Sequence, residues 1–365
     1  MTSLNDLPIR DDLRGKTPYG APQEHVRVQL NVNENTHPIP EGVATDIVTA
    51  VARAVLGVNR YPDREFTELR ESLAAYLGHG LAPENIWAAN GSNEVLQHVL
   101  QAFGGPGRSV LGFPPTYSMH SIIADGTGTR WVTAERDTDY RLSAATVASA
   151  IERERPDIVF LCSPNNPTGT PLGIDVIEAA YDATPGILLV DEAYAEFQDG
   201  PTALSLLADR PRLLVSRTMS KAFAFAGARV GYLAADPAAI DALRLVRLPY
   251  HLSALTQAAA VAALAHADEM LAMVDDIKAQ RDRMIAALPA LGYTPHESAA
   301  NFVLFGGVAD PHAVFESLFA EGILIRDVGI PNHLRVTAGT DAETTIFLDA
   351  LARLGAAGDL GRMAP

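Results

Sequence analysis

Lysine is rare in this chain, and one lysine lies where a primary amine could do chemistry. Of the 28 basic residues, only Lys16, Lys221 and Lys278 are lysines, and the others are arginines. Lys221 follows the short apolar run 213–215, within the segment Ser-Arg-Thr-Met-Ser-Lys-Ala-Phe. Arginine supplies positive charge, but only a primary amine condenses with a carbonyl to form an imine. Lys221 is therefore a candidate for covalent chemistry.

Polar residues also follow two earlier apolar runs that are typical of strands. Asn90-Gly91-Ser92-Asn93 follows the run 86–89 and opens a helical pattern. Free backbone amides at a helix start, approached through a glycine, favour phosphate binding. Capping of the helix by the Ser92 or Asn93 side chain is the simpler alternative. Tyr117 follows the run 110–113 and is either an aromatic platform for a ligand or part of the core.

Two later runs also end in reactive or rigid groups. The run 158–162 leads into Ser-Pro-Asn-Asn-Pro-Thr-Gly, a stiff turn that would fix the amide of Asn166. The run 187–190 leads into Asp191 and Tyr194, and a carboxylate buried there needs a cationic partner. Arg229 follows Lys221 by eight residues. Since ligands of open α/β sheets bind outside the carboxyl ends of the strands, we expect these groups to share one crevice.

This set of groups suits pyridoxal 5′-phosphate. A phosphate matches the helix start and Arg229, an aldehyde matches Lys221, and a ring can stack on Tyr117. Asp191 beside the ring nitrogen would keep it protonated, which makes the ring an electron sink. The predicted cofactor contacts are Gly91, Ser92, Asn93, Tyr117, Asn166, Asp191, Tyr194, Thr218, Ser220, Lys221 and Arg229.

The pattern around these motifs predicts an α/β fold. Short apolar runs alternate with helical repeats such as Val43-Ile47-Val51-Val55, which indicates a mostly parallel sheet covered on both faces, with 229–235 as one further strand. We expect an extended amino-terminal arm at 1–40, a large domain at 41–245 and a smaller α+β domain at 246–365. A single long helix from Ser253 to Leu288 would link the two domains.

Composition narrows the possible functions. The formal charge of −16 argues against non-specific nucleic-acid binding. The single cysteine, Cys162, cannot form an internal disulfide and is expected to be a buried small residue. No apolar stretch indicates a signal peptide or a membrane span, so we expect a cytoplasmic protein. The ten histidines, His98 and His120 among them, show neither metal-ligand spacing nor a predicted partner, and no metal site is expected.

The motifs resemble those of a known enzyme family. Ser-Pro-Asn-Asn-Pro-Thr-Gly, Asp-Glu-Ala-Tyr and Ser-Lys-Ala-Phe with Ala-Gly-Ala-Arg resemble the class II fold-type I pyridoxal-phosphate aminotransferases. Pro-Tyr-Gly at 18–20, Asn-Glu-Asn at 33–35, Tyr-Pro-Asp at 61–63 and Leu-Arg-Val-Thr at 334–337 are similar to the histidinol-phosphate aminotransferase family of actinobacteria. The resemblance covers residues 10 to 345. The resemblance implies a large domain with a mostly parallel sheet of seven strands between helices, a smaller α+β domain and an amino-terminal arm.

The resemblance also implies roles for individual residues. Lys221 would bind the cofactor covalently and Asp191 would pair with the ring nitrogen, while Asn166 and Tyr194 would touch the phenolic oxygen. Tyr61 would reach the cofactor phosphate of a neighbouring subunit, which implies a homodimer with shared active sites. Arg335 would hold the anionic end of histidinol phosphate or of 2-oxoglutarate and glutamate, with Tyr19 and Asn33 closing over the substrate. Asn93 stands where many relatives have aspartate, which leaves its contact open.

Other functions are compatible with parts of this pattern. An aromatic amino acid aminotransferase or a phosphothreonine decarboxylase would share the fold and the cofactor. A pyridoxal-phosphate-binding regulator would need a DNA-binding segment, and the chain has no basic helix-turn-helix pattern. The chain could also be an α/β protein without a ligand site. In that case, seven polar residues at strand ends would coincide there merely as caps. Tyr250 either approaches the cofactor or belongs to a hinge.

Overall fold

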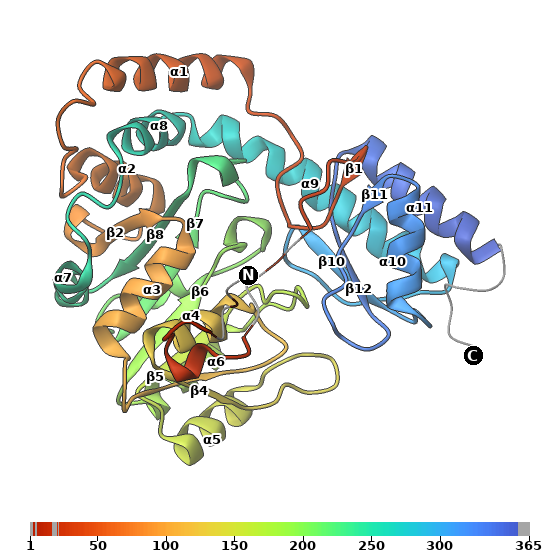
Figure 1. Cartoon of the computed structure of the whole chain (residues 1–365), viewed down its shortest axis with the longest axis horizontal. Helices are drawn as coiled ribbons and strands as arrows, with labels where there is room; N and C mark the ends of the chain where they lie inside the picture. The colour runs from red at the N-terminus through yellow and green to blue at the C-terminus, as the bar shows by residue number, and fades with distance from the viewer. Residues whose placement is uncertain (1–2, 4–5, 17–19, 21, 357–365) are drawn as a thin grey trace.

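The computed structural model describes residues 3, 6–16, 20 and 22–356, and its largest feature is a seven-stranded sheet (Figure 1). The strand order is β2-β8-β7-β6-β5-β3-β4. Only β8 runs antiparallel to its neighbours, β2 and β7, and the remaining pairs are parallel. The strands are β2 (Ile86–Asn90), β3 (Ser109–Gly112), β4 (Arg130–Thr133), β5 (Ile158–Cys162), β6 (Ile187–Asp191), β7 (Leu213–Thr218) and β8 (Val230–Ala235).

Helices cover both faces of this sheet. Every residue of β5, β7 and β8 is buried, which is possible only when neither face meets solvent. The predicted α/β class with a mostly parallel sheet is therefore confirmed. Among the described residues, no helix combines the length and the apolarity that a bilayer crossing requires. The helices packed around the sheet are α2 (Thr67–Leu77), α3 (Ser92–Phe103), α4 (Met119–Thr127), α5 (Ala144–Glu154), α6 (Ile174–Ala183) and α7 (Pro237–Val246). Helix α1 (Glu41–Val55) lies farther out, against α8 (Ala254–Leu264) (Figure 1).

A smaller α+β region follows, as predicted, and lies beside the large sheet (Figure 1). Its antiparallel sheet places β10 (Phe302–Gly306) between β9 (Thr294–Pro295) and β12 (Leu334–Thr337). Helix α10 (Pro311–Ala320) begins where the Asp310 side chain accepts the backbone N–H of Ala313. The chain leaves α10 through Gly322, at a φ of 76° that favours glycine. Helix α11 (Asp341–Ala356) ends the described chain.

The amino-terminal segment connects the two regions. Near its start, Lys16 pairs with Asp125 at the end of α4. Farther along, β1 (Val28–Gln29) pairs in parallel with β11 (Ile323–Leu324) of the smaller region. The segment then turns toward the large sheet. The division of the chain at residues 40 and 245 stays a prediction.

The single helix predicted from Ser253 to Leu288 is wrong. Two helices, α8 (Ala254–Leu264) and α9 (Ala267–Ala287), are separated at Ala265 and His266. The imidazole of His266 contacts Asp46 of α1 at 2.8 Å and Glu269 at 3.1 Å. One tertiary contact and one local contact therefore stabilise the interruption between the two helices. Neither glycine nor proline marks this position, and the apolar pattern continues across it. Periodicity therefore could not reveal it.

Strand β4 was also missed. It spans only Arg130–Thr133 and lies at the edge of the sheet next to β3. The residues of an edge strand need not be apolar, and those of β4 are exposed or half-buried. Strand β4 therefore lacks the apolar run by which the central strands were identified.

Candidate active site

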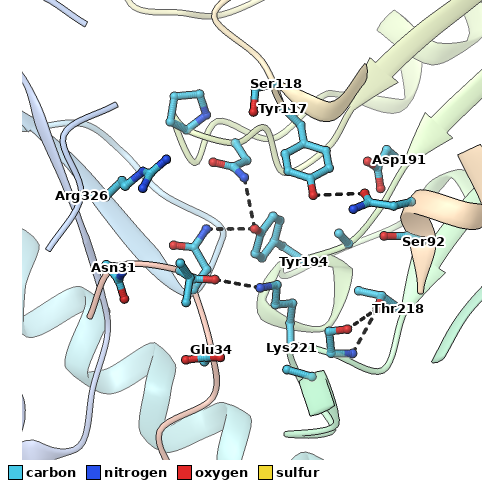
Figure 2. A pocket seen from close by; sticks show the side chains of 18 of the residues that line it. Asn31, Glu34, Ser92, Tyr117, Ser118, Asp191, Tyr194, Thr218, Lys221 and Arg326 are labelled. Atoms are coloured by element: carbon cyan, nitrogen blue, oxygen red, sulfur yellow. Dashed lines mark hydrogen bonds between the residues drawn. The ribbon is translucent and has the colours of Figure 1, made fainter. Parts of the chain in front are cut away.

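A cavity of about 630 Å³ lies at the carboxyl ends of the central parallel strands (Figure 2). Cys162, Asp191 and Thr218, the last residues of β5, β6 and β7, all line it. This volume is in the range of small-molecule sites. Most of the predicted site residues line the cavity, namely Asn33, Ser92, Asn93, Tyr117, Asn166, Asp191, Tyr194, Thr218, Ser220, Lys221, Arg229 and Arg335.

Lys221 projects from just beyond the end of β7 into this cavity (Figure 2). Its Nζ donates a hydrogen bond to the carbonyl oxygen of Val32 at 3.0 Å. Burial is the main cause that lowers the pKa of Lys221 from 10.5 to about 8. Arg335 and Arg229 lower this pKa further, whereas Glu34 raises it. The amine is therefore neutral at a pH where an exposed lysine is still charged.

The start of α3 forms an anion site with Arg229. Its N-cap residue is Gly91, at a φ of 84°, and no side chain caps the first turn. Capping by Ser92 or Asn93, the simpler alternative, is therefore wrong. Gly91 itself does not line the cavity, but a Cβ there would collide with the guanidinium of Arg229. The glycine thus lets a cation approach a helix start, where phosphate binds well.

Two hydroxyl groups extend this site. Thr218 Oγ1 donates to Ser220 Oγ at 2.9 Å, and Arg229 Nη1 lies 3.5 Å from the same Ser220 oxygen. On the other side, Tyr117 Oη donates to Asn93 Oδ1 at 3.1 Å. The side chain of Asn93, whose contact the sequence left open, is thus tied to the aromatic ring. A helix start, a guanidinium and hydroxyls converge on one point, which is the donor set that a phosphate requires.

Asp191 has a histidine partner that the sequence did not reveal. Its Oδ2 lies 3.0 Å from Nε2 of His120, and Ser216 Oγ donates to its Oδ1 at 3.3 Å. The side chains of Asp191 and His120 are both only 1% exposed. No partner of His120 was predicted from the sequence, because α4 carries it over the end of β6 only in the folded chain. The imidazole of His120 thus gives the buried carboxylate of Asp191 a polar partner.

Tyr194 receives hydrogen bonds from two asparagines, one from each side. Asn33 Nδ2 donates to its hydroxyl oxygen at 2.9 Å, and Asn166 Nδ2 does so at 3.3 Å (Figure 2). Burial raises the pKa of Tyr194 well above its usual range. The phenol therefore keeps its proton and can donate it in a hydrogen bond to an acceptor in the cavity.

Arg335 is held at the wall opposite the sheet. Its Nη1 donates to Asn166 Oδ1 at 2.6 Å, and its Nη2 donates to the carbonyl oxygen of Asn31 at 2.7 Å. Its backbone forms a β-bridge with Arg326, whose side chain also lines the cavity. Two guanidinium groups from the smaller region thus face an enclosed space, which suits an anionic ligand.

One predicted residue, Tyr61, lies elsewhere. Tyr61 does not line the cavity. Its side chain is 80% exposed and stacks on Tyr250 with the ring centroids 4.5 Å apart. Tyr250 therefore packs beside Tyr61. Tyr19 lies outside the described residues.

Several cavity residues were not predicted from the sequence. Glu34 and Asn31 flank Asn33 in the arm, and Arg326 follows the apolar run 323–325. Arg326 occupies the same kind of strand-end position that identified Asp191. The rule applied to the large sheet would have found it.

Comparisons with known proteins agree with this geometry. The family description "Aminotransferase class I and II" matches residues 26–351. The chain is 61% identical to a histidinol-phosphate aminotransferase from Paenarthrobacter aurescens, over 96% of both chains. It is 56% identical to one from Mycolicibacterium smegmatis, over 96% of this chain and 94% of the relative.

A solved structure is also similar. The histidinol-phosphate aminotransferase from Sinorhizobium meliloti, in complex with pyridoxal-5′-phosphate, superposes with a TM-score of 0.87 at 26% identity. The match covers 97% of this chain and 100% of that one. Since sequence and structure agree over nearly the whole length, the chain belongs to the aminotransferase class I and II family.

Proposed function

We propose that the chain transfers an amino group between L-histidinol phosphate and 2-oxoglutarate, giving imidazole acetol phosphate and L-glutamate, in histidine biosynthesis. The observation that carries this proposal is the enclosure of the Lys221 amine in one cavity with a buried acid and an anion site. The choice of substrate rests on the names of relatives that are 61% and 56% identical over nearly the full length. A cytoplasmic location stays a prediction.

Pyridoxal 5′-phosphate is the cofactor that these residues fit. Ser92, Ser220 and Arg229 would hold its phosphate at the start of α3, where the absence of a Cβ on Gly91 leaves room for the guanidinium. When bound, the cofactor supplies an electron sink that stabilises negative charge at the carbon bearing the amine. Asp191, supported by His120, would hold the positive charge at the ring nitrogen.

Lys221 would perform two tasks. Its amine would hold the cofactor through the aldehyde, and its Nζ would accept the α proton of the substrate and later return it. A lysine can act as such a base only when it is neutral, and a pKa of about 8 makes this form accessible. The hydroxyl of Tyr194, with Asn166 beside it, would donate to the phenolic oxygen of the cofactor and fix the ring.

The two substrates differ in shape but share an anionic end. Histidinol phosphate carries a phosphate near the amine-bearing carbon, and glutamate carries a carboxylate there. A guanidinium fork binds either group, so Arg335 would serve both half-reactions, with Arg326 beside it. Tyr19 and Asn33 are proposed to close over the opposite end of the substrate.

A homodimer would complete the site. Tyr61 lies outside its own cavity and stacks on Tyr250, and exposed apolar side chains precede both residues in the sequence, including Leu56 at 86% and Leu248 at 75%. Exposed apolar side chains gathered in this way are typical of a protein–protein interface. In the proposed dimer, Tyr61 donates a hydrogen bond to the cofactor phosphate in the partner subunit.

The proposed activity is tested by comparing amino donors. With 2-oxoglutarate as the acceptor, kcat/KM for histidinol phosphate should exceed that for phenylalanine by about 100-fold or more, because a site with polar groups rejects a substrate that leaves them unpaired. Glutamate formation is the readout. A higher kcat/KM for phenylalanine would select an aromatic aminotransferase, and release of carbon dioxide would select a decarboxylase.

Lys221→Ala should bind the cofactor without a covalent bond and lose amine transfer. Loss of the proton transfer alone costs roughly 10²–10⁴-fold, and loss of the covalent site adds to this. Absorbance spectra and turnover are the measurements. Lys278→Ala, which removes a lysine paired with exposed Asp199, is the matched control and should keep both properties. Substantial turnover by Lys221→Ala would refute the role of Lys221.

Cofactor capture by the cofactor-free protein should depend on pH. Because the neutral amine attacks the aldehyde, the rate should rise with pH until Lys221 is deprotonated, near pH 8, and stay level above it. Stopped-flow absorbance measures this rate, with free lysine as the reference for titration of the cofactor itself. A rate that keeps rising toward pH 10.5, the ordinary value for lysine, would show that the cavity does not lower this pKa.

Hybrid dimers test whether Tyr61 acts across subunits. Tyr61→Ala and Lys221→Ala should each lose most activity as homodimers. A hybrid of the two carries one site with both changes and one site with neither, so it should regain up to about half of the activity per dimer. Co-expression with two affinity tags isolates the hybrid. A purified hybrid as inactive as its parents would contradict the shared site.

A further inference from the structure

The cavity contains an acid that the proposed mechanism does not use. Its described lining includes four basic side chains, Lys221, Arg229, Arg326 and Arg335, but only two carboxylates. Asp191 lies at the end of the large sheet, and its carboxylate is hydrogen-bonded to His120 and Ser216. Glu34, the second carboxylate, lies on the arm, and Figure 2 draws it at the end of the cavity away from Asp191.

The Glu34 side chain is exposed and acts on Lys221 through its charge alone, while its backbone is fixed on both sides. Among the described residues, none forms a hydrogen bond or an ion pair with its carboxylate. The preceding residue, Asn33, is 1% exposed, and its backbone N–H donates to Thr337 Oγ1 at 3.0 Å. The following residue, Asn35, donates to the carbonyl oxygen of Ala222 at 3.3 Å. The anchored backbone holds Glu34 at the cavity, and its exposed carboxylate is open to a ligand.

The charges in the cavity restrict what this ligand group can be. The anionic ends of both substrates are matched by arginines, and a carboxylate would repel them. A carboxylate accepts hydrogen bonds and binds cationic groups, so Glu34 suits a ligand group that carries an N–H. Of the groups in the two proposed substrates, apart from the reacting amine, only the imidazole of histidinol phosphate has one.

We propose that Glu34 is a specificity residue whose carboxylate accepts a hydrogen bond from the imidazole N–H of the amino donor. This inference rests on the proposed function. It implies opposite effects on the two half-reactions, because the second carboxylate of 2-oxoglutarate must occupy the same end of the cavity. Glu34 attracts an imidazole there and repels a carboxylate.

Glu34→Gln tests the proposal, since it keeps the shape and removes the charge. We expect kcat/KM for histidinol phosphate to fall about tenfold, the usual effect of losing a charge-assisted hydrogen bond. The KM for 2-oxoglutarate should fall about twofold, because a like charge is gone. Single-turnover absorbance of the holoenzyme measures each half-reaction by itself. Glu24→Gln, which removes an exposed arm carboxylate outside the cavity, is the matched control and should change neither value.

Opposite changes in the two half-reactions support the assignment. Equal losses in both, or a parallel shift of both pH profiles, would mean that Glu34 acts through Lys221 and would overturn it. An unchanged kcat/KM for histidinol phosphate would overturn it as well. A wild-type enzyme that does not accept histidinol phosphate at all would overturn the proposed function itself, so the two failures are distinguishable.

Discussion

The site depends on making the neutral form of one primary amine accessible inside a cavity. An exposed lysine is charged at neutral pH and can neither attack an aldehyde nor accept a proton. Burial, with Arg335 and Arg229 nearby, brings the pKa of Lys221 down to about 8. The same arginines are needed for anions, so one set of charges serves binding and also activates the base.

The fold meets this constraint by joining distant segments around the ends of the parallel strands. Strand β7 leads to Lys221, β6 ends in Asp191, and the arm supplies the carbonyl oxygen of Val32 that holds the amine. The smaller region closes the cavity with Arg335, which contacts both the arm and the turn at Asn166. These contacts join the arm, the smaller region and the turn at Asn166 around the amine before any ligand binds.

Much of this could be predicted from the sequence, because apolar runs followed by polar residues mark the strand ends. That rule identified Asp191, Asn166 and Lys221, and it would also have identified Arg326. It could not identify His120, whose helix crosses to β6 only in the folded chain. The break at His266 was missed for a related reason, since its contact with Asp46 joins segments 220 residues apart. Contacts between distant segments leave no periodic signal.

The most direct test of the central claim is chemical trapping of the enclosed amine. The protein is incubated with pyridoxal 5′-phosphate, reduced with borohydride, digested and mapped by mass spectrometry. The account predicts one stable cofactor adduct per chain, on the peptide that contains Lys221. Modification of Lys16 or Lys278 in its place, or no adduct on the folded protein, would contradict it.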